Sequence, residues 1–302
     1  LSILNAANPL DNKVVIVLHG GAMPFFAIRN YAKNKDLMHR AQSLSVGDVV
    51  EDRMCPAAAP LQGLQPEDLP GSAKMVQVAD AGQALAAFIR YCEAQPWADH
   101  MAAYHFDGPS GEWCPRAAMI GQYTDFSRPM QEWFQTWLRR RYGDDEQALR
   151  AAWNDRDATF ATATVPSAAL QGQTTFFRLR DPRREGQTID YFRAVRDRAL
   201  HDIRYLAAVC KQACQRRKVV GIFYGYEAAM FWSPALFFGE NSTMSYDQAT
   251  AQRSGHMGLS WAAEMEDVDY IAAPYDYLYR RAGGVGESQS LPYAVALRGK
   301  LF

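Results

Sequence analysis

The order of apolar and polar residues along the chain predicts strands that alternate with helices. Residues 14–18 are an unbroken run of valine, isoleucine and leucine that leads into His19 and two glycines, the pattern of a strand buried on both faces. After a polar, proline-rich stretch, residues 85–92 place apolar side chains three and four positions apart, which predicts an amphipathic helix that ends near Pro96. The apolar stripe of this helix consists of Leu85, Phe88, Ile89 and Cys92.

The same two patterns repeat through the rest of the sequence. Four further segments are predicted as strands: Met101–Asp107, Lys218–Tyr226, Val268–Tyr277 and Pro292–Phe302. Three further segments have a helical stripe of apolar residues: Ser127–Gly143, Ile189–Cys214 and Met257–Met265. Between Asn154 and Gln187 neither period is sustained, and we expect this segment to be an excursion on the surface of the domain.

Alternating strands and helices imply parallel strands joined by right-handed crossovers, in either an open doubly wound sheet or a (β/α) barrel. The glycine-rich phosphate-binding turns typical of doubly wound nucleotide-binding folds follow none of the predicted strands. Polar and aromatic residues instead gather at the C-terminal ends of strands, where barrel enzymes build their sites. They are His19, His105, Asp107, Tyr224, Tyr226, Tyr275, Asp276 and Tyr277. We therefore predict an α/β fold of the (β/α)8 TIM barrel class, the alternative for each residue being simple packing at the barrel mouth.

Composition narrows the range of partners. The 302 residues include 32 Lys and Arg against 33 Asp and Glu, which argues against binding to nucleic acid or to a membrane surface. No apolar run approaches the roughly 20 residues that cross a bilayer, so we expect a soluble domain. The five cysteines form no Cys-x-x-Cys pair, and Cys210 and Cys214 are interpreted as buried apolar residues rather than half of a metal site. We predict no metal and no cofactor.

The segment Tyr104–Trp113 carries the sharpest chemical signal. A strand ends there in a turn rich in glycine and proline, which lets the backbone approach a ligand and presents Glu112 beside the indole of Trp113. Glycoside hydrolysis requires a carboxylic acid that protonates the departing oxygen, and an aromatic face suits the apolar side of a sugar ring. Glu112 is therefore a candidate general acid, the alternative being a carboxylate on an ordinary exposed turn.

Several segments carry a resemblance to a known family through their order along the chain. They are Gly108–Trp113, Tyr123–Met130, Trp137–Gly143, Ala151–Trp153, Ile222–Tyr226, Ser254–His256, Ala273–Tyr277 with Gly283–Gly284, and Arg298–Phe302. In this order they resemble bacterial β-galactosidase-like glycoside hydrolases of the clan that uses a retaining (β/α)8 barrel. The resemblance covers residues 13–302 and depends on the whole set of motifs rather than on any one of them.

This resemblance implies a register for the barrel. Strands three to seven would begin near Val14, Met101, Lys218, Asp269 and Pro292. Glu112 would then follow the fourth strand as the general acid/base, and the nucleophilic carboxylate would follow the seventh strand, beyond Phe302. Residues 1–302 would be one partial catalytic barrel domain, which we expect to be inactive without the second carboxylate.

One position departs from the clan. Its members usually have Asn directly before the acid/base, where the amide donates to the 2-hydroxyl of the sugar, whereas this sequence has Gly111. Asp107, His105 and Ser110 are candidates for the missing hydrogen bond, and each has the alternative of a turn or packing role.

Other substrate contacts are expected from the remaining strand ends. The clan often places a Tyr of strand six against the nucleophile, and Tyr275 is preferred to Tyr277 for this position because it directly follows Pro274. Alternation along the strand places Tyr224 and Tyr226 on the same side. The expected substrate-binding residues are Trp113, Asp107, His105, Tyr224, Tyr226 and Tyr275.

The leading hypothesis is a retaining glycoside hydrolase that cleaves a β-linked, galactoside-like carbohydrate. The runner-up, motivated by Gly111, is a catalytically inactive barrel that binds glycans. A third reading, a barrel enzyme of unrelated chemistry, requires a phosphate-binding glycine-rich turn after the last strands, and Gly283–Gly284 follows strand six only.

Overall fold

The computed structural model describes residues 14–18, 76–106, 126, 128–176, 179–227, 255–273, 282–283 and 288–302. Four parallel strands form one sheet in the order β1-β2-β3-β4. The strands are β1 (Val14–Leu18), β2 (Met101–Phe106), β3 (Val219–Phe223) and β4 (Tyr270–Ala272). They fall within the first four segments that the sequence predicts as strands, and each pairs with the next one along the chain.

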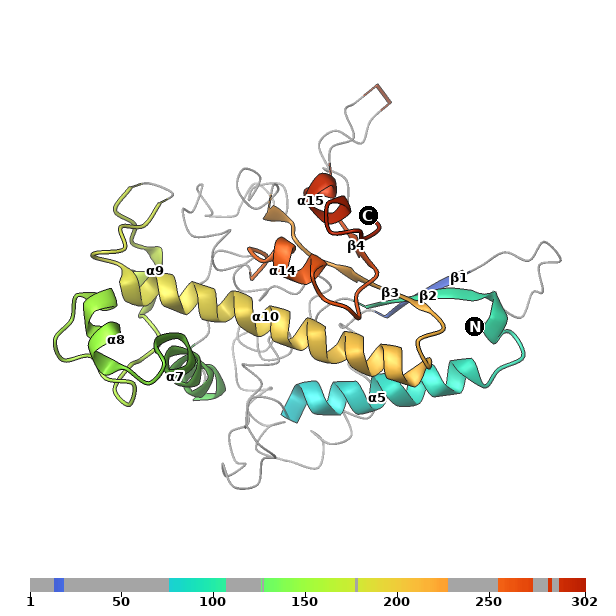
Figure 1. The fold of residues 1–302 in the computed structure, drawn as a ribbon, viewed down its shortest axis with the longest axis horizontal. Helices are drawn as coiled ribbons and strands as arrows, with labels where there is room; N and C mark the ends of the chain where they lie inside the picture. The colour runs from blue at the N-terminus through green and yellow to red at the C-terminus, as the bar shows by residue number, and fades with distance from the viewer. Residues whose placement is uncertain are drawn as a thin grey trace.

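Two helices cover one face of this sheet. Helix α5 (Val76–Glu93) precedes β2, and helix α10 (Gly186–Ala213) precedes β3. The two helices pack side by side (Figure 1). Their buried side chains form one apolar core with side chains of β2, β3 and β4. Both crossovers therefore lie on the same face of the sheet.

Short elements complete this part of the molecule. The 3-10 turn η3 (Ala98–His100) leads into β2, and helix α14 (Leu259–Ala263) precedes β4 and contacts α10. Cys210 and Cys214, near the end of α10, are fully buried in the apolar core, as predicted.

The prediction of a strand over Pro292–Phe302 is wrong for most of that segment. Residues Pro292–Ala296 form helix α15, and Pro292 occupies a first-turn position, where its fixed φ favours a helix. Strand pairing begins only at Leu301, which makes a parallel bridge with Tyr270 beside β4. The amide of Leu301 donates to the carbonyl of Asp269, and the amide of Ile271 donates to the carbonyl of Leu301, both at 3.1 Å. The segment therefore contains both a short helix and a residue paired with a strand. Its apolar residues are too few to tell a helix from a strand in the sequence.

A second group of helices packs on the N-terminal half of α10, at the left of Figure 1. Helices α7 (Arg128–Tyr142) and α8 (Glu146–Trp153) pack against α10, and α9 (Ala168–Gly172) is drawn at the same end of the molecule. Gly143 and Asp144 both adopt φ of 61° between α7 and α8, a left-handed turn that ends α7 where the sequence predicts it. The segment 154–187 supplies Ala158, Phe160 and Ala163 to the apolar core of this group.

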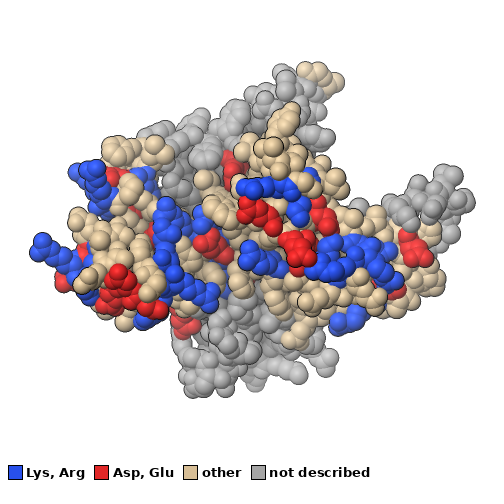
Figure 2. All heavy atoms as spheres, in the orientation of Figure 1, with Lys and Arg blue, Asp and Glu red and all other residues tan. Residues whose placement is uncertain are grey.

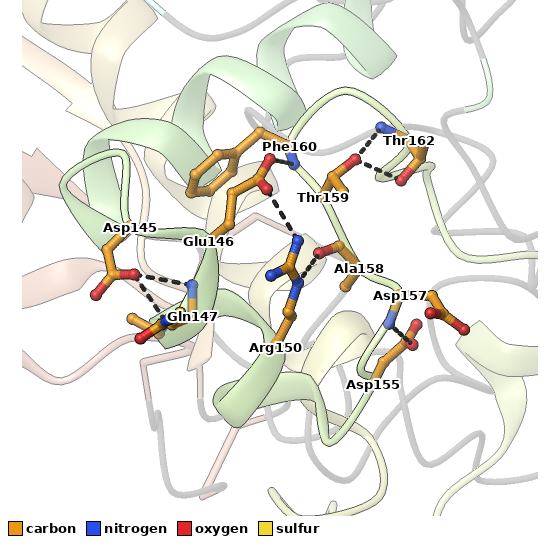
Figure 3. Close-up of polar contacts among 11 residues, drawn as sticks. Asp145, Glu146, Gln147, Arg150, Asp155, Asp157, Ala158, Thr159, Phe160 and Thr162 are labelled. Atoms are coloured by element: carbon orange, nitrogen blue, oxygen red, sulfur yellow. Dashed lines mark hydrogen bonds and ion pairs between the residues drawn. The ribbon is translucent and has the colours of Figure 1, made fainter.

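Side-chain hydrogen bonds attach the start of the segment 154–187 to α8 (Figure 3). Glu146 accepts a hydrogen bond from Arg150 at 3.0 Å and another from the amide of Phe160 at 3.3 Å. Arg150 also donates through Nε to the carbonyl of Ala158 at 3.0 Å. The carboxylate of Asp145 caps α8 by accepting from two amides of its first turn. One turn of helix thereby orders the chain that follows it.

Positive and negative side chains are interspersed on the face shown in Figure 2. Ion pairs on the described surface include Arg216 with Asp267 at 2.7 Å and Arg298 with Glu264 at 2.8 Å. Within the described ranges, no helix combines the length and the apolar character that a membrane span requires.

Candidate functional site

The two faces of the sheet carry different side chains. Tyr104, Val220 and Ile271 point into the apolar core beneath α5 and α10. Side chains alternate along a strand, so their neighbours His105 and Tyr270 lie on the opposite face. His105 is paired in register with Gly221, and Gly221 is paired with Tyr270, which places these three residues in one row across three strands.

A polar and aromatic cluster occupies this row. The hydroxyl of Tyr270 lies 2.9 Å from Nδ1 of His105. The ring of Phe223 packs edge-on against the imidazole, with 4.3 Å between the ring centroids. His105 is almost completely buried, and burial raises the pKa of Tyr270 to about 12. The phenol therefore keeps its proton at neutral pH and acts as a hydroxyl.

Gly221 makes this arrangement possible because the ring of Tyr270 lies directly over it. A Cβ atom at residue 221 would be 1.9 Å from Cζ of Tyr270, a distance that no side chain tolerates. The missing side chain of the middle strand thus lets two outer strands make a hydrogen bond across it.

The end of β3 is fixed by His256. Its Nδ1 accepts hydrogen bonds from the amides of Gly225 at 3.0 Å and Tyr226 at 3.3 Å. Because Nδ1 accepts, the neutral ring carries its proton on Nε2. The imidazole stacks against Tyr224 and Tyr226, with ring centroids 5.1 Å and 4.6 Å away.

Tyr224 and Tyr226 belong to two different apolar clusters, although both rings stack on His256. Tyr224 is buried in the core on the helix side, and its hydroxyl donates to the carbonyl of Gly255 at 2.6 Å. Tyr226 packs instead against Phe223, Met257 and Ala273. Gly225 lies between the two tyrosines with a φ of 81°, so the alternation of a strand does not extend from Tyr224 to Tyr226.

Glu227 follows directly and is partly buried. Burial raises the pKa of its carboxyl, and a hydrogen bond from the amide of Leu259, at 3.2 Å, only partly offsets that effect. The carboxyl also adds to the effect of burial in raising the pKa of Tyr224. Tyr224, His256 and Glu227 therefore join residues 224–227 to residues 255–259.

The structure describes three of the predicted site residues. His105 and Tyr226 both contact Phe223, whereas Tyr224 belongs to the apolar core beneath α5 and α10. The others lie outside the described residues, namely Asp107, Glu112, Trp113 and Tyr275, together with Ser110 and Gly111. Their roles remain predictions.

Sequence reasoning missed Tyr270, Glu227 and the role of His256. A signal for Glu227 was present, because a carboxylate follows two tyrosines at the end of a predicted strand. In the part of the chain that the structure describes, no group of three or more His, Cys, Asp or Glu side chains is arranged to hold a metal ion. The described cluster contains an imidazole, the phenol hydroxyl that is bonded to it and aromatic faces.

Comparison with known proteins gives only distant similarities. No protein-family model matches the sequence. No curated protein matches it either. Among solved structures, a β-galactosidase from Bacillus circulans sp. alkalophilus is 16% identical, with a TM-score of 0.37, over 63% of this chain and 25% of that one.

Two further solved structures are similar at the same level. A polyextremophilic β-galactosidase from the Antarctic haloarchaeon Halorubrum lacusprofundi is 16% identical, with a TM-score of 0.43, over 73% of this chain and 27% of that one. The catalytic domain of β-amylase from Paenibacillus polymyxa is 14% identical, with a TM-score of 0.47, over 74% of this chain and 54% of that one. The chain thus spans about a quarter to a half of these proteins. With TM-scores below 0.5, the three similarities do not establish a shared fold.

Proposed function

We propose that this chain forms part of the (β/α)8 barrel of a retaining glycoside hydrolase that acts on a β-linked, galactoside-like sugar. Glu112 is the proposed general acid/base, and the nucleophilic carboxylate is proposed to lie beyond residue 302. Two observations support this proposal: the order of the sequence motifs along the chain, and the order of the four strands in the sheet.

The observation that carries the proposal is the strand order. Strands β1 to β4 pair in the order of the chain, and α5 and α10 share one core on one face of the sheet. A doubly wound sheet reverses its strand order at a switch point and carries helices on both faces, whereas successive units of a barrel continue in one direction. The described strands follow the second pattern, which supports a barrel.

The position of Glu112 in the chain supports its role. Strand β2 ends at Phe106, and Glu112 follows six residues later (106 to 112). Six extended residues span at most about 20 Å, so the carboxyl stays within that distance of the strand end that carries His105. Barrel enzymes gather their catalytic groups at this end of their strands.

In the proposed reaction, the carboxylic acid of Glu112 gives its proton to the glycosidic oxygen while the bond from that oxygen to the anomeric carbon breaks. The second carboxylate bonds to the anomeric carbon in the same step. Glu112, now ionised, then takes a proton from the water that displaces this carboxylate. The sugar leaves with its anomeric configuration retained.

The test compares substrates with different leaving groups in the full-length protein. The dinitrophenolate of a dinitrophenyl β-galactoside departs as an anion without being protonated. The alkoxide of an alkyl β-galactoside departs only when an acid protonates it. We expect Glu112→Gln to lower kcat/KM for the alkyl substrate about 10²–10⁴-fold and to affect the dinitrophenyl substrate much less.

The matched control is Glu266→Gln, because the side chain of Glu266 is 87% exposed and takes no part in the proposed site. Unchanged turnover of both substrates by the Glu112→Gln variant would rule out the assignment of the acid/base. Binding of β-galactosides by the unaltered protein without any turnover would favour the inactive glycan-binding barrel that Gly111 suggests.

A further inference from the structure

We propose that Tyr270 is a positioning residue for His105, holding its imidazole in the tautomer that presents Nε2–H to a hydroxyl group of the sugar. The identity of the ligand rests on the proposed function, but the positioning itself depends only on the described geometry.

The geometry brings the two side chains together across an intervening strand. The Tyr270 hydroxyl lies 2.9 Å from Nδ1 of His105, a normal hydrogen-bond distance. The residue between them in the row is Gly221, and any side chain there would displace the phenol ring. The ring of Phe223 also packs edge-on against the imidazole, with 4.3 Å between the ring centroids. The contact is therefore specified by three strands at once.

A protonated phenol can donate to Nδ1 or accept from an Nδ1–H, and we assign the phenol as the donor. Burial keeps Tyr270 protonated at neutral pH. Among the described residues, Nδ1 of His105 is the hydrogen-bond partner of this hydroxyl. When the phenol donates its single proton to Nδ1, that nitrogen carries none, and a neutral imidazole then has its proton on Nε2.

A fixed Nε2–H suits the chemistry of a sugar site. Sugar hydroxyls both donate and accept, so a nitrogen that only donates selects one orientation of the hydroxyl group. Gly111 leaves the chain without the amide donor expected before the acid/base, and His105 was one of the candidates to replace it. The Tyr270 contact gives His105 the tautomer that such a replacement requires.

Nitrogen NMR of the full-length protein tests the positioning directly. Long-range ¹H–¹⁵N correlation distinguishes a ring nitrogen that accepts from one that carries a proton, and a His105→Gln variant identifies the His105 signals. We expect an accepting Nδ1 and a protonated Nε2 in the unaltered protein, and a mixture of both tautomers in Tyr270→Phe. An unchanged tautomer in Tyr270→Phe would overturn the proposal, because a tyrosine that only packs leaves it unaltered.

The matched control is Tyr293→Phe, which removes a hydroxyl from a side chain that is 85% exposed on α15. This control is expected to keep the His105 tautomer of the unaltered protein. Gly221→Ala provides a second route, since it displaces the Tyr270 ring without altering its hydroxyl, and it should give the same tautomer mixture as Tyr270→Phe.

Activity measurements separate this inference from the proposed function. If the protein hydrolyses β-galactosides, Tyr270→Phe should lower kcat/KM about tenfold, and Tyr293→Phe should leave it unchanged. A tautomer change in a protein that shows no turnover would support the positioning role and contradict the hydrolase. Turnover of β-galactosides together with an unchanged tautomer in Tyr270→Phe would support the hydrolase and contradict the positioning role.

Discussion

The two halves of α10 lie in different kinds of core. The C-terminal half contributes Ile203, Ala207 and Cys210 to an apolar cluster shared with α5 and the sheet. The N-terminal half also packs apolar side chains against α7 and α8, but it buries Asp190 among them. The first core is mainly apolar and has hydrogen bonds such as that from the Tyr104 hydroxyl to Glu93 at 2.8 Å, whereas the second places a buried carboxylate at the centre of its hydrogen bonds.

Asp190 shows what the second kind of core provides. One carboxylate oxygen accepts from the hydroxyl of Tyr142 at 2.5 Å and from the indole of Trp153 at 3.0 Å. The other lies 3.2 Å from Nε of Arg141. These groups come from α7 and α8, so a single side chain fixes both helices to α10.

The largest expected effect is on the stability of the helical group. Asp190→Ala leaves the Tyr142 hydroxyl and the Trp153 indole without their acceptor, and each such loss costs about 1–3 kcal/mol. We expect the free energy of unfolding to fall by about 2–4 kcal/mol in urea titrations. Glu266→Ala is the control, because its carboxylate is 87% exposed and lies 3.6 Å from the exposed Arg216, and it should cost about 1 kcal/mol or less. Equal losses for the two variants would contradict the contrast between the cores.

The two regions should respond to pH in opposite directions. Glu185, which precedes α10, has its pKa lowered: burial alone would raise it, but hydrogen bonds from Thr175 and Asp181 and the charge of Arg180 outweigh burial. Its contribution to stability is therefore present above its unfolded pKa, near 4.5, and is lost as pH falls through the folded value. Glu185→Gln should lower Tm at pH 7, with a deficit that shrinks toward acid pH.

Glu227, at the end of β3, has its pKa raised by burial. Its contribution is fully present below the unfolded pKa and is lost as pH rises through the folded value. Glu227→Gln should therefore match the unaltered protein in acid and gain in relative Tm as pH increases. Thermal melts of both variants across this range check the opposite signs, and parallel curves would refute them.

The smallest expected effect concerns the cap of α8. Asp145 accepts from the amides of Gln147 at 2.8 Å and Ala148 at 3.3 Å. Asp145→Ala removes this cap and should cost about 1 kcal/mol in urea titrations. Asp155→Ala, which removes only one exposed contact to the amide of Asp157, is expected to cost less. A larger loss for Asp155→Ala would show that the turn, and not the cap, orders this segment.

Much of the fold was predictable because its signals are local. The β-branched run at 14–18 and the apolar stripe at 189–214 identify β1 and α10 without knowledge of their neighbours. The segment after Pro292 was not predictable in this way, because five helical residues and the start of a strand share one apolar run. Its helix fits the local preference of Pro292, whereas the bridge of Leu301 depends on pairing with β4.

The described site was less predictable for a related reason. His105 was identified from its position at a strand end, but its partner Tyr270 lies 165 residues away in the sequence. Their contact depends on the register of three strands and on a glycine whose importance is evident only when the strands are aligned. Polarity at strand ends indicates where a site lies, whereas the pairings within it require the folded sheet.

The passage of α10 through both cores restricts how this protein can change. The helix contains 28 residues, and each residue advances it by about 100° of rotation. Inserting or deleting one residue near its middle would turn Asp190 away from Tyr142 or Ile203 away from the sheet-side core, since both cannot be kept. A substitution there changes the contacts of one side chain. A change of length instead rotates one half of the helix relative to the other, so that the buried faces of the two halves no longer keep their relative orientation. We therefore expect the number of residues between these positions to be far less variable than the residues themselves.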